Sequence, residues 1–208
     1  MSNSVNPREL SDSISELIAA EDFQRAEQVI LEAQRKADVQ GDAEIKHLVL
    51  SELIELYSIW DPPLWSKAEA LSEEREQLVR SAYSKLQTAM ILHRGVHDYQ
   101  RAIKKLEEAV AEGRAERDDK TVYTSLSLLG QIDLELGKSG EALAVLSQIE
   151  EMVERKASVV VGDETGFLEG LRLQSLETQR VARLASILSS ACRDRDFKER
   201  LRALAVPR

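Results

Sequence analysis

The chain has 208 residues, of which 43% are hydrophobic, 31% are charged and only 4% are aromatic, and its net charge is −9. This composition is typical of a folded protein and excludes a disordered segment. The acidic balance disfavours nucleic acid and anionic membranes as main ligands, because both attract Lys and Arg. Cys192 is the only cysteine, which excludes an intramolecular disulfide and a zinc site built from several thiolates.

The sequence has no apolar run that is long enough for a membrane span, and Met1–Leu10 lacks the apolar core of a signal peptide. We therefore expect a cytoplasmic protein. Glycine and proline are rare, at 9 and 4 residues, and the apolar residues are mostly Leu, Ile, Val and Ala. These features predict an all-α fold.

Three helices are predicted in the first 60 residues. Asn6 is a good capping residue and Pro7 suits the first position of a helix, so we expect a helix over 7–20. Apolar residues then recur at helical spacing over 23–39 and over 43–60.

The middle of the chain contains fewer helix breakers. Residues 64–94 form either one long helix or two helices with a join near Glu73–Glu76. Beyond Gly95 we expect helices over 99–112, 118–136 and 141–156. A loop over 157–166, a long helix over 167–192 and a short helix over 196–205 complete the prediction.

A short pattern recurs four times in the predicted helices. Its centre is an alanine, at positions 26, 68, 102 and 142, and the first three copies carry Phe23, Trp65 and Tyr99 three residues before it. The alanines are 42, 34 and 40 residues apart, a spacing that is typical of stacked helical hairpins. An alanine lets two helices approach closely, and the preceding aromatic ring fills the space beside the turn.

These units resemble tetratricopeptide repeats over residues 7–156. The fourth unit, Tyr123–Glu154, carries Leu126, Leu129, Gly130, Gly137, Ala142 and Leu146 at or near the signature spacing of the family. The second unit matches only at Trp65 and Ala68. The resemblance implies a right-handed α-solenoid of about four hairpins over 1–156, with capping helices over 167–208.

In tetratricopeptide proteins the first helix of each hairpin lines a concave groove that holds a partner peptide or helix. Alignment on the four alanines places in this groove Ser11, Ser15, Tyr57, Trp60, Gln87, Ile91, Arg94, Thr124, Ser127 and Gln131. Trp65 extends the aromatic corner at Trp60, where a second copy of the chain could also bind. The alternative for Tyr57 and Trp60 is that they are core residues.

Candidate chemical motifs are better explained without a ligand. His93 and His97 are four residues apart, but Gly95 lies between them, so we expect two ordinary residues at a helix end. The segment Gly162–Gly166 lacks the lysine of a phosphate loop and has too few acidic residues for a calcium loop. Cys192 lies on an apolar stripe and predicts a buried, inert thiol. We therefore expect no metal, no cofactor and no catalytic activity.

The sequence as a whole predicts a non-catalytic scaffold or adaptor that binds a peptide or helix of a partner protein, with no nucleic acid and no membrane. Two alternatives remain: a secretion-type chaperone for an aggregation-prone client, and a regulatory domain that senses a small ligand. Homodimerisation at the aromatic corner is a further possibility.

Overall fold

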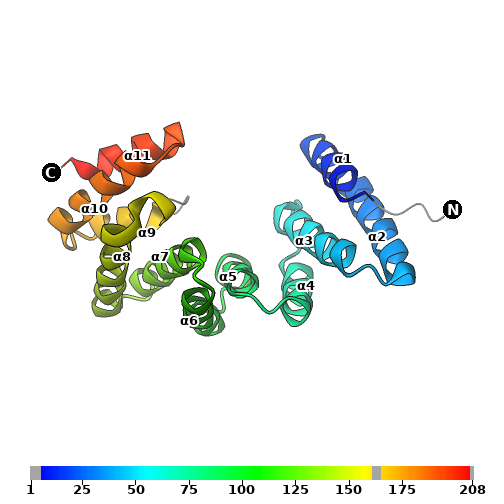
Figure 1. Ribbon diagram of the computed structural model, residues 1–208, viewed down its shortest axis with the longest axis horizontal. Helices are drawn as coiled ribbons and strands as arrows, with labels where there is room; N and C mark the ends of the chain where they lie inside the picture. The colour runs from blue at the N-terminus through cyan, green and yellow to red at the C-terminus, as the bar shows by residue number, and fades with distance from the viewer. Residues whose placement is uncertain (1–5, 161–164, 207–208) are drawn as a thin grey trace. The chain divides into compact units, whose positions relative to one another are not determined.

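The computed structural model describes residues 6–160 and 165–206, and their side chains except those of 156–160. Helices account for nearly all of this part of the chain, which contains no strand, and most helices pack against a neighbour in sequence (Figure 1). The all-α prediction is confirmed. The helices are α1 (Pro7–Ala19), α2 (Phe23–Gln40), α3 (Ala43–Ile59), α4 (Trp65–Leu78), α5 (Ala82–Ile91), the π-helical turn η1 (Leu92–Val96), α6 (Tyr99–Glu116), α7 (Asp119–Glu135), α8 (Ser139–Val160), α9 (Gly166–Leu173), α10 (Thr178–Ala191) and α11 (Arg195–Ala205).

The chain divides into two compact units, each with its own hydrophobic core. Unit 1 consists of Met1–Arg80 and Met90–Asp98, and unit 2 consists of Ser81–Ala89 and Tyr99–Arg208. The sequence pattern does not predict this division, because the repeated alanines continue through both units.

In unit 1, the helices α1 to α4 pack in chain order, and α1 also contacts α3. The first three begin with a side-chain cap: Asn6, Asp22 and Asp42 each accept a hydrogen bond from a backbone N–H of the first turn. Their apolar stripes meet in a core that includes Ile14, Ile30 and Val49, all of which are fully buried. The caps fix where each helix starts, and the stripes decide which side faces inward.

The four alanines of the recurring pattern, Ala26, Ala68, Ala102 and Ala142, are all completely buried. Each lies in the second helix of a pair, where α2, α4, α6 and α8 begin. A side chain no larger than a methyl group allows the close helix approach that the pattern predicts.

In unit 2, α7 is the central helix. It packs against α6, α8 and α9, and every residue from Thr121 to Leu128 is buried. Phe167 of α9 fits against Gly130 of α7 so closely that a β-carbon at Gly130 would overlap with the phenyl ring. On the same side of α9, Gly166 lies next to Gln131 and Gly170 lies next to Leu134. Three glycines therefore set the distance between α7 and α9.

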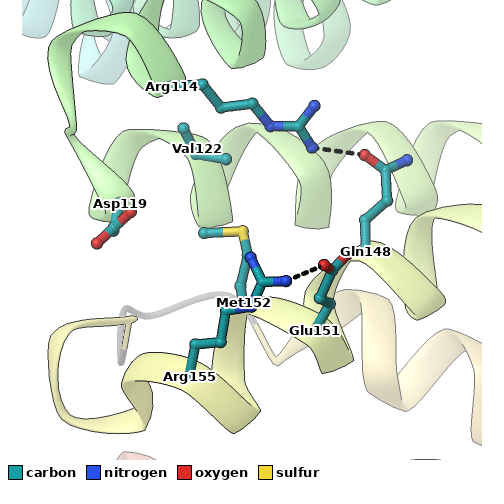
Figure 2. A pocket seen from close by; sticks show the side chains of 7 residues that line it. All are labelled: Arg114, Asp119, Val122, Gln148, Glu151, Met152 and Arg155. Carbon is teal, nitrogen blue, oxygen red and sulfur yellow. Dashed lines mark hydrogen bonds and ion pairs between the residues drawn. The ribbon is translucent and has the colours of Figure 1, made fainter.

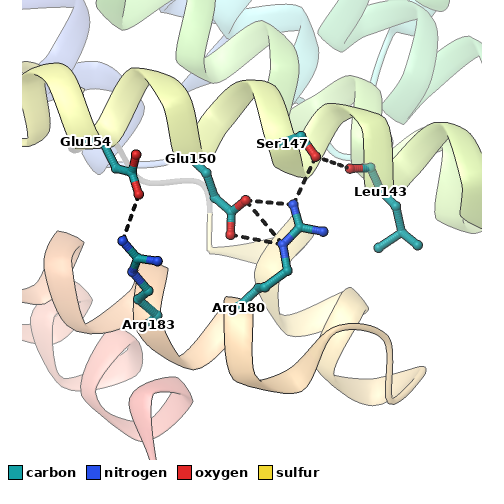
Figure 3. A network of polar contacts seen from close by, with 6 residues as sticks. All are labelled: Leu143, Ser147, Glu150, Glu154, Arg180 and Arg183. Atoms are coloured by element: carbon teal, nitrogen blue, oxygen red, sulfur yellow. Dashed lines mark hydrogen bonds and ion pairs between the residues drawn. The ribbon is translucent and has the colours of Figure 1, made fainter.

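Two arginines of α10 bind the acidic face of α8 (Figure 3). The Arg180 guanidinium contacts both carboxylate oxygens of Glu150, at 2.6 to 3.2 Å, and donates to the hydroxyl of Ser147. Arg183 pairs with Glu154 at 2.8 Å. The predicted capping helices thus carry arginines that attach α10 to the preceding hairpin.

Residues 64–94 form two helices, and the break falls at 79–81 instead of near Glu73–Glu76. Ser81 and Ser84 cap the start of α5 reciprocally, because the hydroxyl of each accepts the backbone N–H of the other at 3.3 and 3.2 Å. This Ser-x-x-Ser signal lies in the sequence and marks the true helix start.

The prediction of one long helix over 167–192 is wrong. The structure has α9 and α10 separated by residues 174–177, with Ser175 and Glu177 in the left-handed region at φ 56° and 47°. Leu176 N–H bonds to the carbonyl of Leu171 and closes the end of α9 in a Schellman motif. No glycine or proline marks this end, so the sequence pattern alone missed it.

The predicted loop over 157–166 is also partly wrong. Helix α8 continues to Val160, and α9 already begins at Gly166. Residues 161–164, which include most of the predicted turn, lie outside the described residues.

A glycine-to-alanine pair tests the packing between α7 and α9. Gly130→Ala should destabilise the protein by about 1–3 kcal/mol, because the new methyl group overlaps with Phe167. Gly140→Ala, in open space on α8, should be neutral or stabilise by up to about 1 kcal/mol through helix propensity. Urea unfolding measures both, and equal effects of the two substitutions would contradict the tight contact.

Candidate protein-binding surface

Helix α3 of unit 1 presents a mixed apolar and acidic stripe on its accessible side. Leu48, Glu52, Glu55 and Ile59 follow each other at intervals of four, three and four residues, which places them on one face of the helix. Glu55 is exposed, Leu48 and Glu52 are partly exposed, and Ile59 keeps 44% of its surface accessible. The opposite side of α3 supplies Val49, Leu53 and Leu56 to the core.

Helix α1 lies beside this stripe. The hydroxyl of Ser11 donates a hydrogen bond of 2.7 Å to Glu52 Oε1, which ties the two helices together at this point. Ser15, one turn further along α1, is exposed. We call this surface the α1–α3 face and define it by Ser11, Ser15, Leu48, Glu52, Glu55 and Ile59.

The carboxylates of this face differ from two carboxylates of α2 that are paired with lysines. On α2, Glu32 pairs with Lys36 and Asp38 pairs with Lys46, at 2.8 and 2.7 Å. Among the described residues, neither Glu52 nor Glu55 forms an ion pair, and the salt-bridge partners of unit 1 lie on other helix faces. The face therefore carries uncompensated negative charge.

The sequence-predicted residues Tyr57 and Trp60 lie on a different side of unit 1. Tyr57 is only 6% exposed, and its hydroxyl donates a 2.5 Å hydrogen bond to Glu27 of α2. Burial and this hydrogen bond raise the pKa of Tyr57, which keeps the hydroxyl protonated as a donor. Trp60 stacks at an angle on Phe23 and on Tyr57, with centroid distances of 5.8 and 6.0 Å. Both residues take part in the packing of unit 1.

A longer turn explains why the alignment selected Tyr57. Five residues separate α3 from α4, whereas three separate α1 from α2. Counting back eleven positions from Ala26 gives the exposed Ser15, but the same count from Ala68 gives Tyr57. The two extra residues move the equivalent position back to Glu55, which is exposed. Pro62 and Pro63 are the visible signal of this insertion.

Three further predicted residues lie in unit 1 near the turn η1. Trp65 packs on Gly95, where a β-carbon would overlap with the indole ring. Ile91 is buried, and Arg94 is exposed. The π-helical geometry of η1 brings the Gly95 backbone to the ring, so Trp65 has a packing role here.

The remaining predicted residues belong to unit 2. Gln87 donates a 3.3 Å hydrogen bond to the hydroxyl of Tyr83 on the same helix. On α7, Thr124 and Ser127 are 8% and 2% exposed, while Gln131 is partly exposed and bonded to Glu135. Of the α7 residues that were predicted to contact a partner, Gln131 is the most accessible.

Unit 2 also contains a hollow of about 520 Å³ where the end of α6, the start of α7 and the outer side of α8 meet (Figure 2). It is lined by Arg114, Asp119, Val122, Gln148, Glu151, Met152 and Arg155. Arg114 already donates to Gln148 at 2.8 Å, and Arg155 pairs with Glu151 at 2.5 Å. Since these polar groups satisfy each other, the hollow shows no set of side chains that converge on a ligand.

A polar pair of a buried arginine and a half-buried histidine connects α3 and α4. Nε of Arg75 donates to Nε2 of His47 at 3.1 Å, which requires that this nitrogen of the histidine carries no proton. Burial, followed by the charge of Arg75, lowers the pKa of His47. The pair links α3 to α4.

Within the described residues, no three His, Cys, Asp or Glu side chains come together closely enough to hold a metal ion. Cys192 is buried, and its thiol lies 3.5 Å from the carbonyl of Asp194. The same part of the chain has no helix with the length and apolar character that a bilayer crossing requires.

Comparisons with protein-family models, with curated proteins and with solved structures find no match to this chain.

The Arg75–His47 pair predicts a pH effect on stability. The folded protein binds a proton at His47 less readily than the unfolded chain does, so the free energy of unfolding should fall as the pH drops below about 6.5, the ordinary pKa of histidine. His47→Gln retains an acceptor for Arg75 and should flatten this dependence between about pH 7 and pH 5.5. Urea unfolding at several pH values checks this, and an unchanged slope in the variant would contradict the assignment.

Proposed function

We propose that this protein is a non-catalytic binding module that holds a helix or an extended segment of a partner protein on the α1–α3 face. The observation that carries the proposal is the stripe from Leu48 to Ile59. It combines the exposed Ile59 and the partly exposed Leu48 with two acidic side chains that form no ion pair, on a helix whose opposite side packs into the core. Two adjacent helices with such a face match the helix-in-groove mode of recognition, in which anchors repeat at helical spacing.

We further propose that the hairpins α1–α2, α3–α4 and α7–α8 are tetratricopeptide-like units. Three observations support this: the buried alanine at the start of each second helix, the contact between the first helices α1 and α3, and the corresponding contact between α7 and α9. On this basis α9 and α10 act as a further, capping hairpin, with α9 next to α7 and α10 next to α8. Their glycine contacts and arginine pairs supply the specific packing that a cap needs.

A pair of conservative surface variants tests the proposed function. Ile59→Gln removes an exposed apolar contact from the α1–α3 face, whereas Val39→Gln makes the same chemical change on α2, where Val39 is 89% exposed. Loss of one apolar anchor should weaken capture of a partner from native lysate by about fivefold, as for a moderate interface residue. The readout is quantitative mass spectrometry of proteins that are retained by the immobilised chain.

Val39→Gln should retain the partner as the unaltered chain does. Equal retention by Ile59→Gln and the unaltered chain would reject the α1–α3 face as the binding surface. Both variants should unfold at the same urea concentration, which separates a binding effect from a loss of folded protein.

A further inference from the structure

We infer that the segment held on the α1–α3 face is a basic amphipathic helix from another protein, an inference that rests on the proposed function. The first observation is the distribution of charge between the units. Unit 1 contains 18 acidic and 9 basic residues, whereas unit 2 contains 19 of each. The whole net charge of −9 therefore belongs to the unit that carries the face.

The second observation is the order of side chains along the stripe. Leu48 and Ile59 are eleven residues apart, or about 16 Å along the helix at 1.5 Å per residue. Glu52 and Glu55 lie between these two apolar ends. A partner helix could place apolar residues against the two ends of the stripe and Lys or Arg between them. Its apolar residues would bury Leu48 and Ile59, and its cations would neutralise the two glutamates.

The cations of α1 and α3 do not compensate these carboxylates. Lys46 is the only Lys or Arg of α3, and it is already paired with Asp38 on α2. Arg8 is the only basic residue of α1, beside Glu9, Asp12 and Glu16 on the same helix. The two helices together are therefore acidic, which selects a basic partner segment over an acidic one by charge complementarity.

A second copy of this chain does not supply a suitable segment from its two most basic helices, α10 and α11, each of which has two more basic than acidic residues. Their main apolar residues are buried in the core of unit 2: Val181, Leu184 and Leu188 of α10, and Phe197, Leu201 and Leu204 of α11. With these side chains buried, neither helix can bind Leu48 and Ile59 of another copy. The occupant is therefore assigned to a different protein.

Three synthetic helical peptides test the inference with the full-length protein. Each has leucine at the apolar positions, and the polar positions are all lysine, all glutamine or all glutamate. Fluorescence anisotropy should show tightest binding of the lysine peptide. That binding should weaken several-fold between about 0.05 M and about 0.5 M salt, since salt screens exposed charges.

Matched charge variants locate the binding site. The double variant Glu52→Gln/Glu55→Gln keeps the side-chain size and a hydrogen-bond partner for Ser11. It should weaken the affinity for the lysine peptide by about fivefold, the effect expected for losing two exposed ion pairs. Glu32→Gln/Glu74→Gln removes the same charge from α2 and α4, where both residues are exposed, and should change the affinity less than about twofold.

Equal weakening by the two double variants would overturn the inference, because the peptide would then sense only the net charge. If the glutamine or glutamate peptide binds more tightly than the lysine peptide, and Ile59→Gln weakens that binding, the basic partner would be overturned. The proposed function would then be preserved. Absence of binding by all three peptides would overturn the helical occupant, while the lysate capture decides the proposed function separately. A dimer seen by sedimentation and abolished by Ile59→Gln would assign the face to a second copy instead.

Discussion

Close approach between helices at small residues is the constraint on which the rest of this structure depends. Ala26, Ala68, Ala102 and Ala142 are fully buried where the second helix of each pair begins, and Gly130 provides the notch for Phe167. Larger side chains at these points would separate the helices and leave their apolar stripes partly exposed to water. The helices can stack closely because these residues have no bulky side chain, and aromatic rings fill the remaining space.

The polar side chains divide into those that reinforce this packing and those that do not. Arg180 and Arg183 attach α10 to α8, and Arg75 with His47 connects α3 and α4. Glu52 and Glu55, by contrast, have no cationic partner among the described residues, on a face that also exposes Ile59. Unpaired charge beside exposed apolar surface contributes little to folding, which is why we propose a binding role for this face.

Helix positions could be predicted well wherever the sequence carries caps or breakers. Asn6, Asp22 and Asp42 mark helix starts that the structure confirms. The structure also confirms a helix start after Pro63, at α4. The sequence prediction missed the ends of α4 and α9. Ser81 caps the helix that follows α4, and the backbone N–H of Ser175 closes the end of α9. Residues of many types can make such hydrogen bonds, so they leave no clear mark in the sequence. The alignment on the alanines selects accessible positions, Ser11 and Ser15, where the turn has three residues, and it selects the buried Tyr57 where the turn is two residues longer.

The sequence by itself determined the all-helical class, the capped helix starts and the recurring small residue, because each depends on neighbouring positions along one helix. Only the tertiary structure decided which polar residues are exposed. Thr124 and Ser127 look like surface residues in the sequence, yet α7 is enclosed by three other helices. Exposure is a property of several helices at once, so the sequence pattern of a single helix cannot distinguish a buried serine from an exposed one.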